Sequence, residues 1–279
     1  MSRKIFALSI TLILLLALST PAQAITYGHS DGTLHPSVGT IMTIWPSNGF
    51  LIQWCSGTLI GPTVFLTAGH CTRQVTNFME LNPNSRVWVT FASDASEYNQ
   101  NSTTYTVHRG DLITNPDYNR YFGQYGLSDP GDVGVIRLSE EPSGIPIAVL
   151  PKLGLLDELK AEHKLKDTLF TVVGYGDQRE TNRTAGQAIT YSDYTRKYAN
   201  GDYLSLTDAW LSLSMNFATG NGGVCTGDSG GPHFINYGGN EILVSITAVG
   251  DTNCKALDKS YRMDTEAARN FLDEFVKLP

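Results

Sequence analysis

Residues 222–234 read GGVCTGDSGGPHF, and this stretch decides how the chain is interpreted. The glycines around Ser229 tolerate backbone angles that other residues avoid, so composition alone predicts a tight turn. A second interpretation makes Ser229 a nucleophile. A nucleophilic serine needs a base that takes its proton and a third group that orients the base. The rest of the sequence must therefore supply a histidine and an acid.

The base is sought among the six histidines of the chain. His70 lies in the stretch LTAGHC, residues 66–71, at the end of an apolar run. A disulfide bond at Cys71 would fix the backbone beside it. His70 is therefore the histidine whose surroundings suit a catalytic base.

The two stretches together resemble the chymotrypsin-like serine endopeptidases, the trypsin family. The family signature around the base is TAGHC, which occurs at residues 67–71, and the signature around the nucleophile is GDSGGP, at residues 227–232. The third member of the family's triad is an aspartate at the start of an apolar strand. Asp132, which precedes VGVIRL, fits that position, whereas Asp129 belongs to an Asp-Pro-Gly turn.

The resemblance implies an activity and a set of roles. His70 would take the proton of Ser229 as the serine attacks a peptide carbonyl, and Asp132 would orient the imidazole. An acyl-enzyme would form and water would release it. The expected partners are protein or peptide substrates, and no cofactor or metal is expected.

The glycine turn also has a place in this chemistry. The amide groups of Gly227 and Ser229 would point together at the developing oxyanion, because Gly227 has no Cβ to prevent it. The turn interpretation and the catalytic interpretation are then both correct.

Short runs rich in Val, Ile, Thr and Tyr recur along the chain, separated by Gly, Pro, Asn and Asp, and predict an all-β sandwich or barrel. The resemblance implies an all-β fold of two six-stranded antiparallel β-barrels of chymotrypsin-like type with a C-terminal helix. The active site is expected between the barrels. The clearest strand runs are residues 87–91, 133–138, 169–173 and 242–249.

The domain boundaries follow from composition. The segment 140–151 carries prolines and a glycine and suits a crossing between two β units. We therefore expect an N-terminal barrel at 25–141 and a C-terminal barrel at 142–279, together one peptidase domain. Helical periodicity is present at 153–166 and 265–277, with Asp264 as the expected N-cap of the second helix.

Four cysteines, Cys55, Cys71, Cys225 and Cys254, allow three pairings. We expect two local disulfides, Cys55–Cys71 and Cys225–Cys254. A zinc site is the alternative, but the chain has no C-x-x-C motif and no second cluster with metal-like spacing.

The N-terminus predicts export. Arg3 and Lys4 precede an apolar run at residues 5–18, and Ala22-Gln23-Ala24 follows as a small-residue cleavage site. A membrane anchor is the alternative, but the run is short for a span. Residues 1–24 are therefore expected to be a signal peptide, and the mature protein is expected outside the cell or in the periplasm, with no membrane association after cleavage.

Cleavage after Ala24 would also create a functional terminus. In the trypsin family the aspartate before the nucleophile pairs with a buried N-terminal amine, so the resemblance implies a pair between Ile25 and Asp228. Signal cleavage alone could then deliver the amine. Cleavage after Ala22 is the alternative, and it would leave an extended terminus without this pair.

By motif position, Gly223 and Val224 are expected at the base of the primary specificity pocket, and Val249 and Gly250 in its wall. No acidic residue stands at Gly223, so we expect an uncharged, apolar side chain before the scissile bond. The alternative is that Lys259 enters the pocket and favours an acidic side chain.

Three other function classes fit the sequence less well. The formal charge of −7 argues against nucleic-acid binding. An esterase of the α/β-hydrolase type would place its histidine well after the G-x-S-x-G serine, but the only later histidine is His233, four residues on, which we expect to be a solvent-facing strand residue. A catalytically inactive binding protein of the same fold would lack a triad residue, and none is missing. The protein is expected to act as a monomer.

Overall fold

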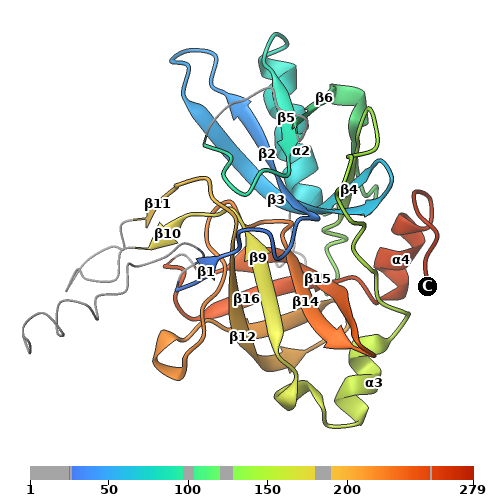
Figure 1. The fold of residues 1–279 in the computed structure, drawn as a ribbon. Helices are drawn as coiled ribbons and strands as arrows, with labels where there is room; N and C mark the ends of the chain where they lie inside the picture. Colours follow the sequence, from blue (N-terminus) through green and yellow to red (C-terminus); the bar gives the residue numbers. More distant parts are fainter. Residues whose placement is uncertain (1–24, 26, 97–103, 120–127, 180–189, 252) are drawn as a thin grey trace, which may run out of the picture.

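The computed structural model shows two β units, one above the other in Figure 1. No helix in the part of the chain described here is long and apolar enough to cross a membrane. The predicted signal peptide lies outside the described residues. The structure describes residues 25, 27–96, 104–119, 128–179, 190–251 and 253–279.

The first unit is a seven-stranded antiparallel sheet that curves around an apolar interior. Its strand order is β6-β5-β2-β3-β4-β8-β7, and ladder irregularities in the β2–β3 and β3–β4 pairs bend it. The strands are β2 (Val38–Ile44), β3 (Leu51–Gly61), β4 (Val64–Thr67), β5 (Val87–Thr90), β6 (Thr104–Val107), β7 (Leu112–Thr114) and β8 (Gly134–Arg137).

The second unit is a closed six-stranded barrel. Its order is β12-β13-β16-β15-β14-β9, and β9 pairs back with β12 to close it. A short strand, β1 (His29–Ser30), adds to β12 from outside, and β10 (Gln178–Arg179) and β11 (Thr190–Tyr191) form a separate hairpin. The barrel strands are β9 (Phe170–Gly174), β12 (Lys197–Leu206), β13 (Trp210–Ser214), β14 (Pro232–Tyr237), β15 (Asn240–Gly250) and β16 (Leu257–Arg262).

These two units confirm the expected two-barrel fold with a C-terminal helix. Only the second unit closes through strand pairs among the described residues, since no ladder there joins β6 to β7. All four predicted strand runs are strands: β5, β8, β9 and β15.

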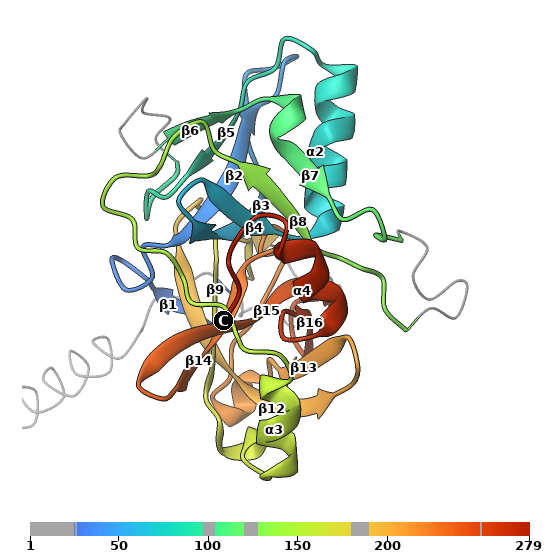
Figure 2. The same cartoon turned by 90° about the vertical axis from the view of Figure 1, so that its right-hand side faces the viewer.

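Two helices lie in the second half of the chain, as predicted. They are α3 (Leu155–Ala161), continued by a 3-10 turn at Leu165–Asp167, and α4 (Glu266–Leu272). Figure 2 shows α3 at the end of the second unit and α4 at the junction of the two units. The segment after α4 packs on the first unit, where the guanidinium of Arg137 lies 5.5 Å from the centre of the Phe275 ring.

The predicted N-cap of α4 is wrong. The cap is Thr265, whose hydroxyl accepts a hydrogen bond from the amide of Ala268 at 3.2 Å. Asp264 is instead fully buried, where it holds the guanidinium of Arg262 and the amide of Leu156. Leaving the buried guanidinium of Arg262 without a carboxylate would cost more free energy than losing a helix cap, so Asp264 pairs with Arg262 and Thr265 caps the helix.

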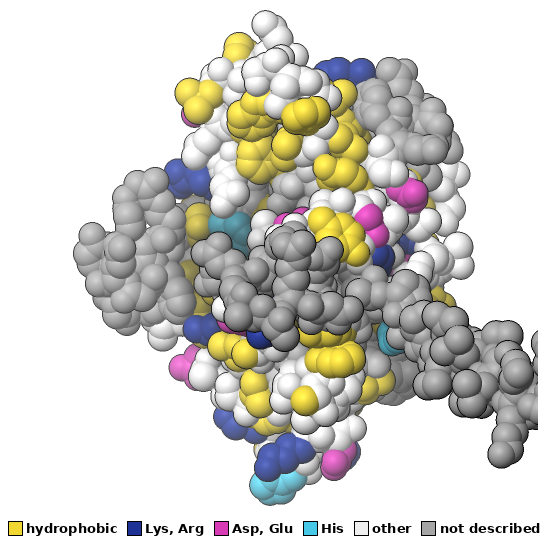
Figure 3. All heavy atoms as spheres, turned by 90° about the vertical axis from the view of Figure 1, so that its left-hand side faces the viewer, with side chains coloured by type: hydrophobic (Ala, Val, Ile, Leu, Met, Phe, Trp, Pro, Cys, Tyr) yellow, Lys and Arg dark blue, Asp and Glu magenta, His cyan; other side chains and the backbone are white. Residues whose placement is uncertain are grey.

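One further helix, α2 (Gly69–Leu81), was not predicted. It carries buried Val75 and Phe78 on one face, and the ring of Phe78 contacts those of Trp45 and Trp54 at centroid distances of 5.6 and 5.2 Å. Helix α2 belongs to the first unit, and Figure 3 shows apolar side chains gathered on one face of that unit.

A buried arginine joins the two units. Arg196 donates through Nε to Asp31 at 2.7 Å, and its Nη1 donates to the carbonyls of Val38 and Phe91 in the first unit at 2.9 and 3.0 Å. Tyr175 also crosses, since its hydroxyl donates to the carbonyl of Ala92 at 2.8 Å. Polar groups thus reinforce an apolar core that runs through both units.

Loss of Arg196 should be strongly destabilising. Arg196→Met would remove the guanidinium from the buried carboxylate of Asp31, which keeps the imidazole of His35 as its remaining partner. The loss should therefore fall below the range of about 3–5 kcal/mol that is typical when a buried pair is broken outright. Urea unfolding, followed by tryptophan fluorescence in a Ser229→Ala background to prevent self-digestion, measures this loss. Adding Asp31→Asn should recover part of it, and a loss below about 1 kcal/mol would contradict the assignment.

Candidate active site

His70 lies in the first turn of α2, and Asp132 holds it at two points. The Oδ2 atom of Asp132 accepts from the ring Nδ1 at 2.9 Å, and Oδ1 accepts from the His70 amide at 2.8 Å. Asp132 is 5% exposed, just before β8. Gly69 permits this approach, because a Cβ there would lie 3.0 Å from the carbonyl oxygen of Val133. The carboxylate therefore fixes both the ring and the backbone of His70.

Asp129, the other candidate acid, is engaged elsewhere. Its Oδ1 atom accepts from the amide of Gly131 at 2.8 Å, as expected for the Asp-Pro-Gly turn. The structure brings Asp132, and not Asp129, to His70.

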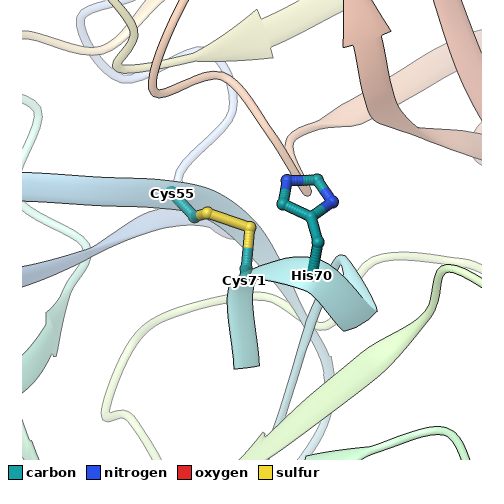
Figure 4. A group of neighbouring side chains, drawn as sticks. All are labelled: Cys55, His70 and Cys71. Carbon is teal, nitrogen blue, oxygen red and sulfur yellow. A yellow bond between two sulfur atoms is a disulfide. The ribbon is translucent and has the colours of Figure 1, made fainter. Parts of the chain in front are cut away.

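The disulfide Cys55–Cys71 is formed beside His70, and Cys225–Cys254 is formed in the second unit. Figure 4 shows the first bridge with the imidazole pointing away from it. The sulfurs of Cys55 and Cys71 lie near the His70 ring as a metal site would require. They are bonded to each other, however, so they cannot supply the thiolates that bind zinc.

Ser229 lies in a turn that the first unit holds in place. Its carbonyl accepts from the amide of Ser56 on β3 at 2.9 Å. Gly227 and Gly230 have φ angles of 94° and 79°, which favour glycine. A Cβ at Gly230 would lie 2.1 Å from the hydroxyl of Thr67, so the close contact between the units also requires glycine.

The carbonyl of Gly227 is bound by two side chains of the first unit. It accepts from Gln53 Nε2 at 2.7 Å and from the Ser56 hydroxyl at 3.0 Å. The amides of Gly227 and Ser229 donate to no other residue in the described part of the chain. Both amides are therefore available to an oxyanion. Gln53 was not predicted, because no local motif links it to a turn 174 residues away.

His70 and Ser229 line the same cavity, which has a volume of about 420 Å³. Of the predicted pocket residues, Val224, Val249 and Gly250 also line it. Gly223 is buried beside them but does not reach the cavity surface; a Cβ there would lie 2.2 Å from Cγ of Met215. The other lining residues are Trp54, Cys55, Gln74, Cys225, Thr226, Gly227, Thr247, Ala248, Asp251 and Cys254.

Charged groups near the cavity are committed to other contacts. Lys259 does not line it; its amine lies 4.3 Å from the centre of the Trp210 ring. The alternative that Lys259 enters the pocket is therefore wrong. The carboxylate of Asp251 accepts from the amides of Lys255 and Ala256, which close a turn.

Asp228 is fully buried behind the serine. Its carboxylate accepts from the amides of Gly176 and Cys225 at 2.7 and 2.8 Å and makes no ion pair among the described residues. Burial raises the pKa of Asp228 to about 7, although these two hydrogen bonds lower it. Ile25 is also buried, with its amide in the peptide bond to residue 24.

The expectation that His233 faces solvent is wrong. His233 is fully buried on β14, and its Nε2 lies 2.5 Å from Oδ2 of Asp258. β14 pairs with β15 on one side and with β9 on the other, so it is a central strand of a closed barrel. The esterase alternative thereby loses its histidine, because this imidazole lies inside the barrel.

Comparison with known proteins gives consistent matches. A family model described as Trypsin matches residues 41–270. CLIP domain-containing serine protease B15 of Anopheles gambiae is 24% identical over 210 residues, which are 72% of this chain and 55% of that protein. Brachyurin of Leptuca pugilator is 26% identical over 76% of this chain and 84% of its own length.

Two further matches extend this result. The urokinase-type plasminogen activator of Gallus gallus is 27% identical over 76% of this chain and 48% of its own length. The chain thus spans about half the length of two of these three relatives. A solved structure titled HL collagenase superimposes with a TM-score of 0.62 at 17% identity, covering 91% of this chain and 100% of that one, which supports the fold.

The burial of Asp228 predicts how stability depends on pH in a chain whose bond between residues 24 and 25 is intact. Folded Asp228 keeps its proton up to a pKa of about 7, whereas the unfolded carboxyl loses it near its ordinary pKa of 3.8. Stability should therefore fall between these pH values, by at most about 1.4 kcal/mol per pH unit from this group.

Urea unfolding from pH 4 to pH 8 in the Ser229→Ala background measures this dependence. Asp228→Asn is the matched control, and its stability should fall less steeply with pH over that range. Equal slopes for the two proteins would show that Asp228 does not carry the effect.

Proposed function

Because the chain belongs to the trypsin family of serine proteases, we propose that it is a secreted endopeptidase that hydrolyses peptide bonds through His70, Asp132 and Ser229. The observation that carries the proposal is the two-point hold of Asp132 on His70, at the edge of the cavity that Ser229 also lines. Its substrates are proteins or peptides.

The contacts of His70 give the order of proton transfers. With Nδ1 donating to Asp132, Nε2 is the nitrogen that can take the Ser229 proton. The serine oxygen attacks the carbonyl carbon, and the resulting oxyanion accepts from the Gly227 and Ser229 amides. His70 then gives the proton to the leaving amine as the C–N bond breaks. Water repeats the sequence on the acyl-enzyme and releases the acid.

Hydrogen bonds to the turn at Gly227 would fix the positions of the oxyanion donors before substrate binds. The hydrogen bonds from Gln53 and Ser56 to the carbonyl of Gly227 orient the following peptide groups from outside the cavity. Donors fixed in advance need no reorganisation when charge develops, and one such donor is worth about 2.7–4 kcal/mol in a comparable hydrolase.

We assign the terminal amine created by cleavage after Ala24 to Asp228. Two observations support this assignment: the side chain of Ile25 is buried, and the buried carboxylate has hydrogen bonds but no cation beside it in the segments that the structure describes. The amine would convert a costly isolated charge into a pair. Secretion to the extracellular space or the periplasm and the division at 25–141 and 142–279 belong to the same proposal, as does action as a monomer.

Triad substitutions test the activity. The Ser229→Ala variant should release no measurable amine from a peptide library that the wild-type protein cleaves. Asp132→Asn should lower kcat about 10⁴-fold, the loss found when this aspartate of a serine protease triad becomes asparagine. Asp129→Asn is the matched control, and it should leave kcat within a few-fold of wild type. Equal losses for the two aspartate variants would contradict the assignment.

The start of the chain can be tested separately. The secreted protein should begin at Ile25 by N-terminal sequencing. A variant with one alanine added before Ile25 should be at least tenfold less active, because its amine is displaced from Asp228. Full activity of the extended variant would overturn the amine pair without affecting the triad.

A further inference from the structure

An aromatic pair joins the segment after Ile25 to a loop of the second unit, and the proposed reaction does not use it. The ring of Tyr27 stacks on the ring of Phe217, with the ring centres 3.9 Å apart and an angle of 19° between the planes. Phe217 is still 59% exposed, so the other parts of its ring face solvent. A ring presented in this way offers the N-terminal segment an apolar surface to pack on.

The backbone of Tyr27 has a conformation that needs support from such a contact. Its φ angle is 63°, in the left-handed region that residues with a side chain rarely adopt. Ile25 has a φ angle of 45°, and its carbonyl accepts from the amide of Gly28, so these residues form one tight turn. Strained turns persist where the surrounding structure determines them. The stack on Phe217 is a side-chain contact that can do so here.

Strand pairing fixes the chain just after this turn. β1 pairs with β12, so the backbone is attached to the barrel from residue 29 onward. The amide of Asp31 then donates to the carbonyl of Arg196 at 3.0 Å. Tyr27 lies between this pairing and Ile25, so its stack attaches the part of the segment that the strand pairing leaves.

The loop that carries Phe217 is held by its own hydrogen bonds. Phe217 opens a 3-10 turn, Phe217–Thr219, and Asn216 caps this turn by accepting from the amide of Ala218 at 3.0 Å. The carbonyl of Asn216 accepts from the hydroxyl of Thr219 at 2.8 Å. Gly220 ends the turn with a φ angle of 84°. The loop itself therefore positions the ring of Phe217.

The same loop continues into the candidate active site. The chain runs from Phe217 to Val224, which lines the cavity. The next residue is Cys225, whose amide donates to the carboxylate of Asp228 at 2.8 Å. A segment that packs on Phe217 is thus attached to the stretch that leads to Asp228, the residue to which we assigned the terminal amine.

We propose that Tyr27 and Phe217 are positioning residues whose stack favours insertion of the N-terminal amine beside Asp228. The stack holds the segment that carries Ile25 against the loop that leads to the cavity. It acts on the equilibrium between an inserted and a released amine and does not touch the reacting atoms. This inference rests on the proposed function, because only a chain cleaved after Ala24 has this amine.

The test measures release of the amine without turnover. Protein that starts at Ile25, in the Ser229→Ala background, is treated with cyanate, and carbamylation of the Ile25 amine is followed by mass spectrometry. An inserted amine is protected, so the protein should react at least tenfold more slowly than a free peptide that begins ITYG. Phe217→Ala should react at least about threefold faster than the starting protein, within the range found for aromatic pairs.

Two variants serve as controls for the ring. Phe217→Tyr keeps an aromatic ring for Tyr27 and should react at the rate of the starting protein. Phe50→Ala removes another exposed phenylalanine, which lies in the first unit and is 67% exposed, and should also leave the rate unchanged. A general loss of packing would not distinguish Phe217→Ala from these two proteins in this way.

A double-mutant cycle identifies the partner of Phe217. Tyr27→Ala should raise the carbamylation rate by about the same factor as Phe217→Ala. The double variant should react no faster than either single variant, because one contact cannot be lost twice. Factors that multiply in the double variant would show that the two rings act independently, and they would overturn the proposal.

The remaining outcomes separate the stack from the proposed function. If Ile25 of the starting protein reacts as fast as the free peptide, or if the secreted protein has another start, the amine pair fails and this inference fails with it. If Ile25 is protected and Phe217→Ala reacts equally slowly, only the stack is overturned. Should Phe217→Ala fail to fold, Phe217→Leu decides, because it removes the ring, keeps apolar bulk and must also react at least threefold faster.

Discussion

The contact between the two β units at Ser56 is the constraint on which the site depends. Its amide donates to the carbonyl of Ser229, and its hydroxyl donates to the carbonyl of Gly227 while accepting from the amide of Tyr175. One residue of the first unit thus fixes two carbonyls of the turn in the second unit. Movement of the units against each other would disturb the proposed oxyanion donors and the proposed nucleophile together.

The position of His70 depends on the same strand, β3, that carries Ser56. The strand that carries Ser56 also carries Cys55, whose disulfide to Cys71 anchors the start of α2 next to the imidazole. Asp132 then sets the ring orientation. The proposed base therefore lies on the unit that also holds the turn of Ser229, so two separate barrels can share one precise geometry.

Buried charge is the second organising feature. Arg196 pairs with Asp31 and His233 pairs with Asp258, whereas Asp228 has hydrogen bonds but no cationic partner within the described part of the chain, whose bond before Ile25 is intact. A buried carboxylate without a cation is less costly in its protonated form, so the proposed terminal amine of Ile25 would act on the protonation of Asp228. The carboxylates of Asp31 and Asp258 already have a basic side chain beside them.

Much of the fold and of the candidate site could be predicted from the sequence, because the signals were local. The stretches around His70 and Ser229 hold the glycines, the cysteines and the candidate catalytic side chains within a few residues of one another, and both disulfides are formed as expected. Helix α2 was not predicted because the signature TAGHC, at the start of its stretch, was interpreted as a catalytic motif and not as the beginning of a helix. Its apolar positions, Val75 and Phe78, were the available signal.

What could not be predicted depends on pairs that are distant in sequence. Gln53 reaches Gly227 across 174 positions, and His233 meets Asp258 only because the barrel closes. Asp264 is a normal N-cap residue locally, yet the buried Arg262 claims it. In each case the partner that determines the role of a polar side chain is brought close by tertiary structure alone.

The most direct test of the central claim, an activated Ser229, is the intact mass of the protein before and after reaction with a serine-directed fluorophosphonate. The account predicts one adduct on the protein that starts at Ile25 and none on Ser229→Ala. Folded protein that starts at Ile25 and takes up no adduct would contradict it.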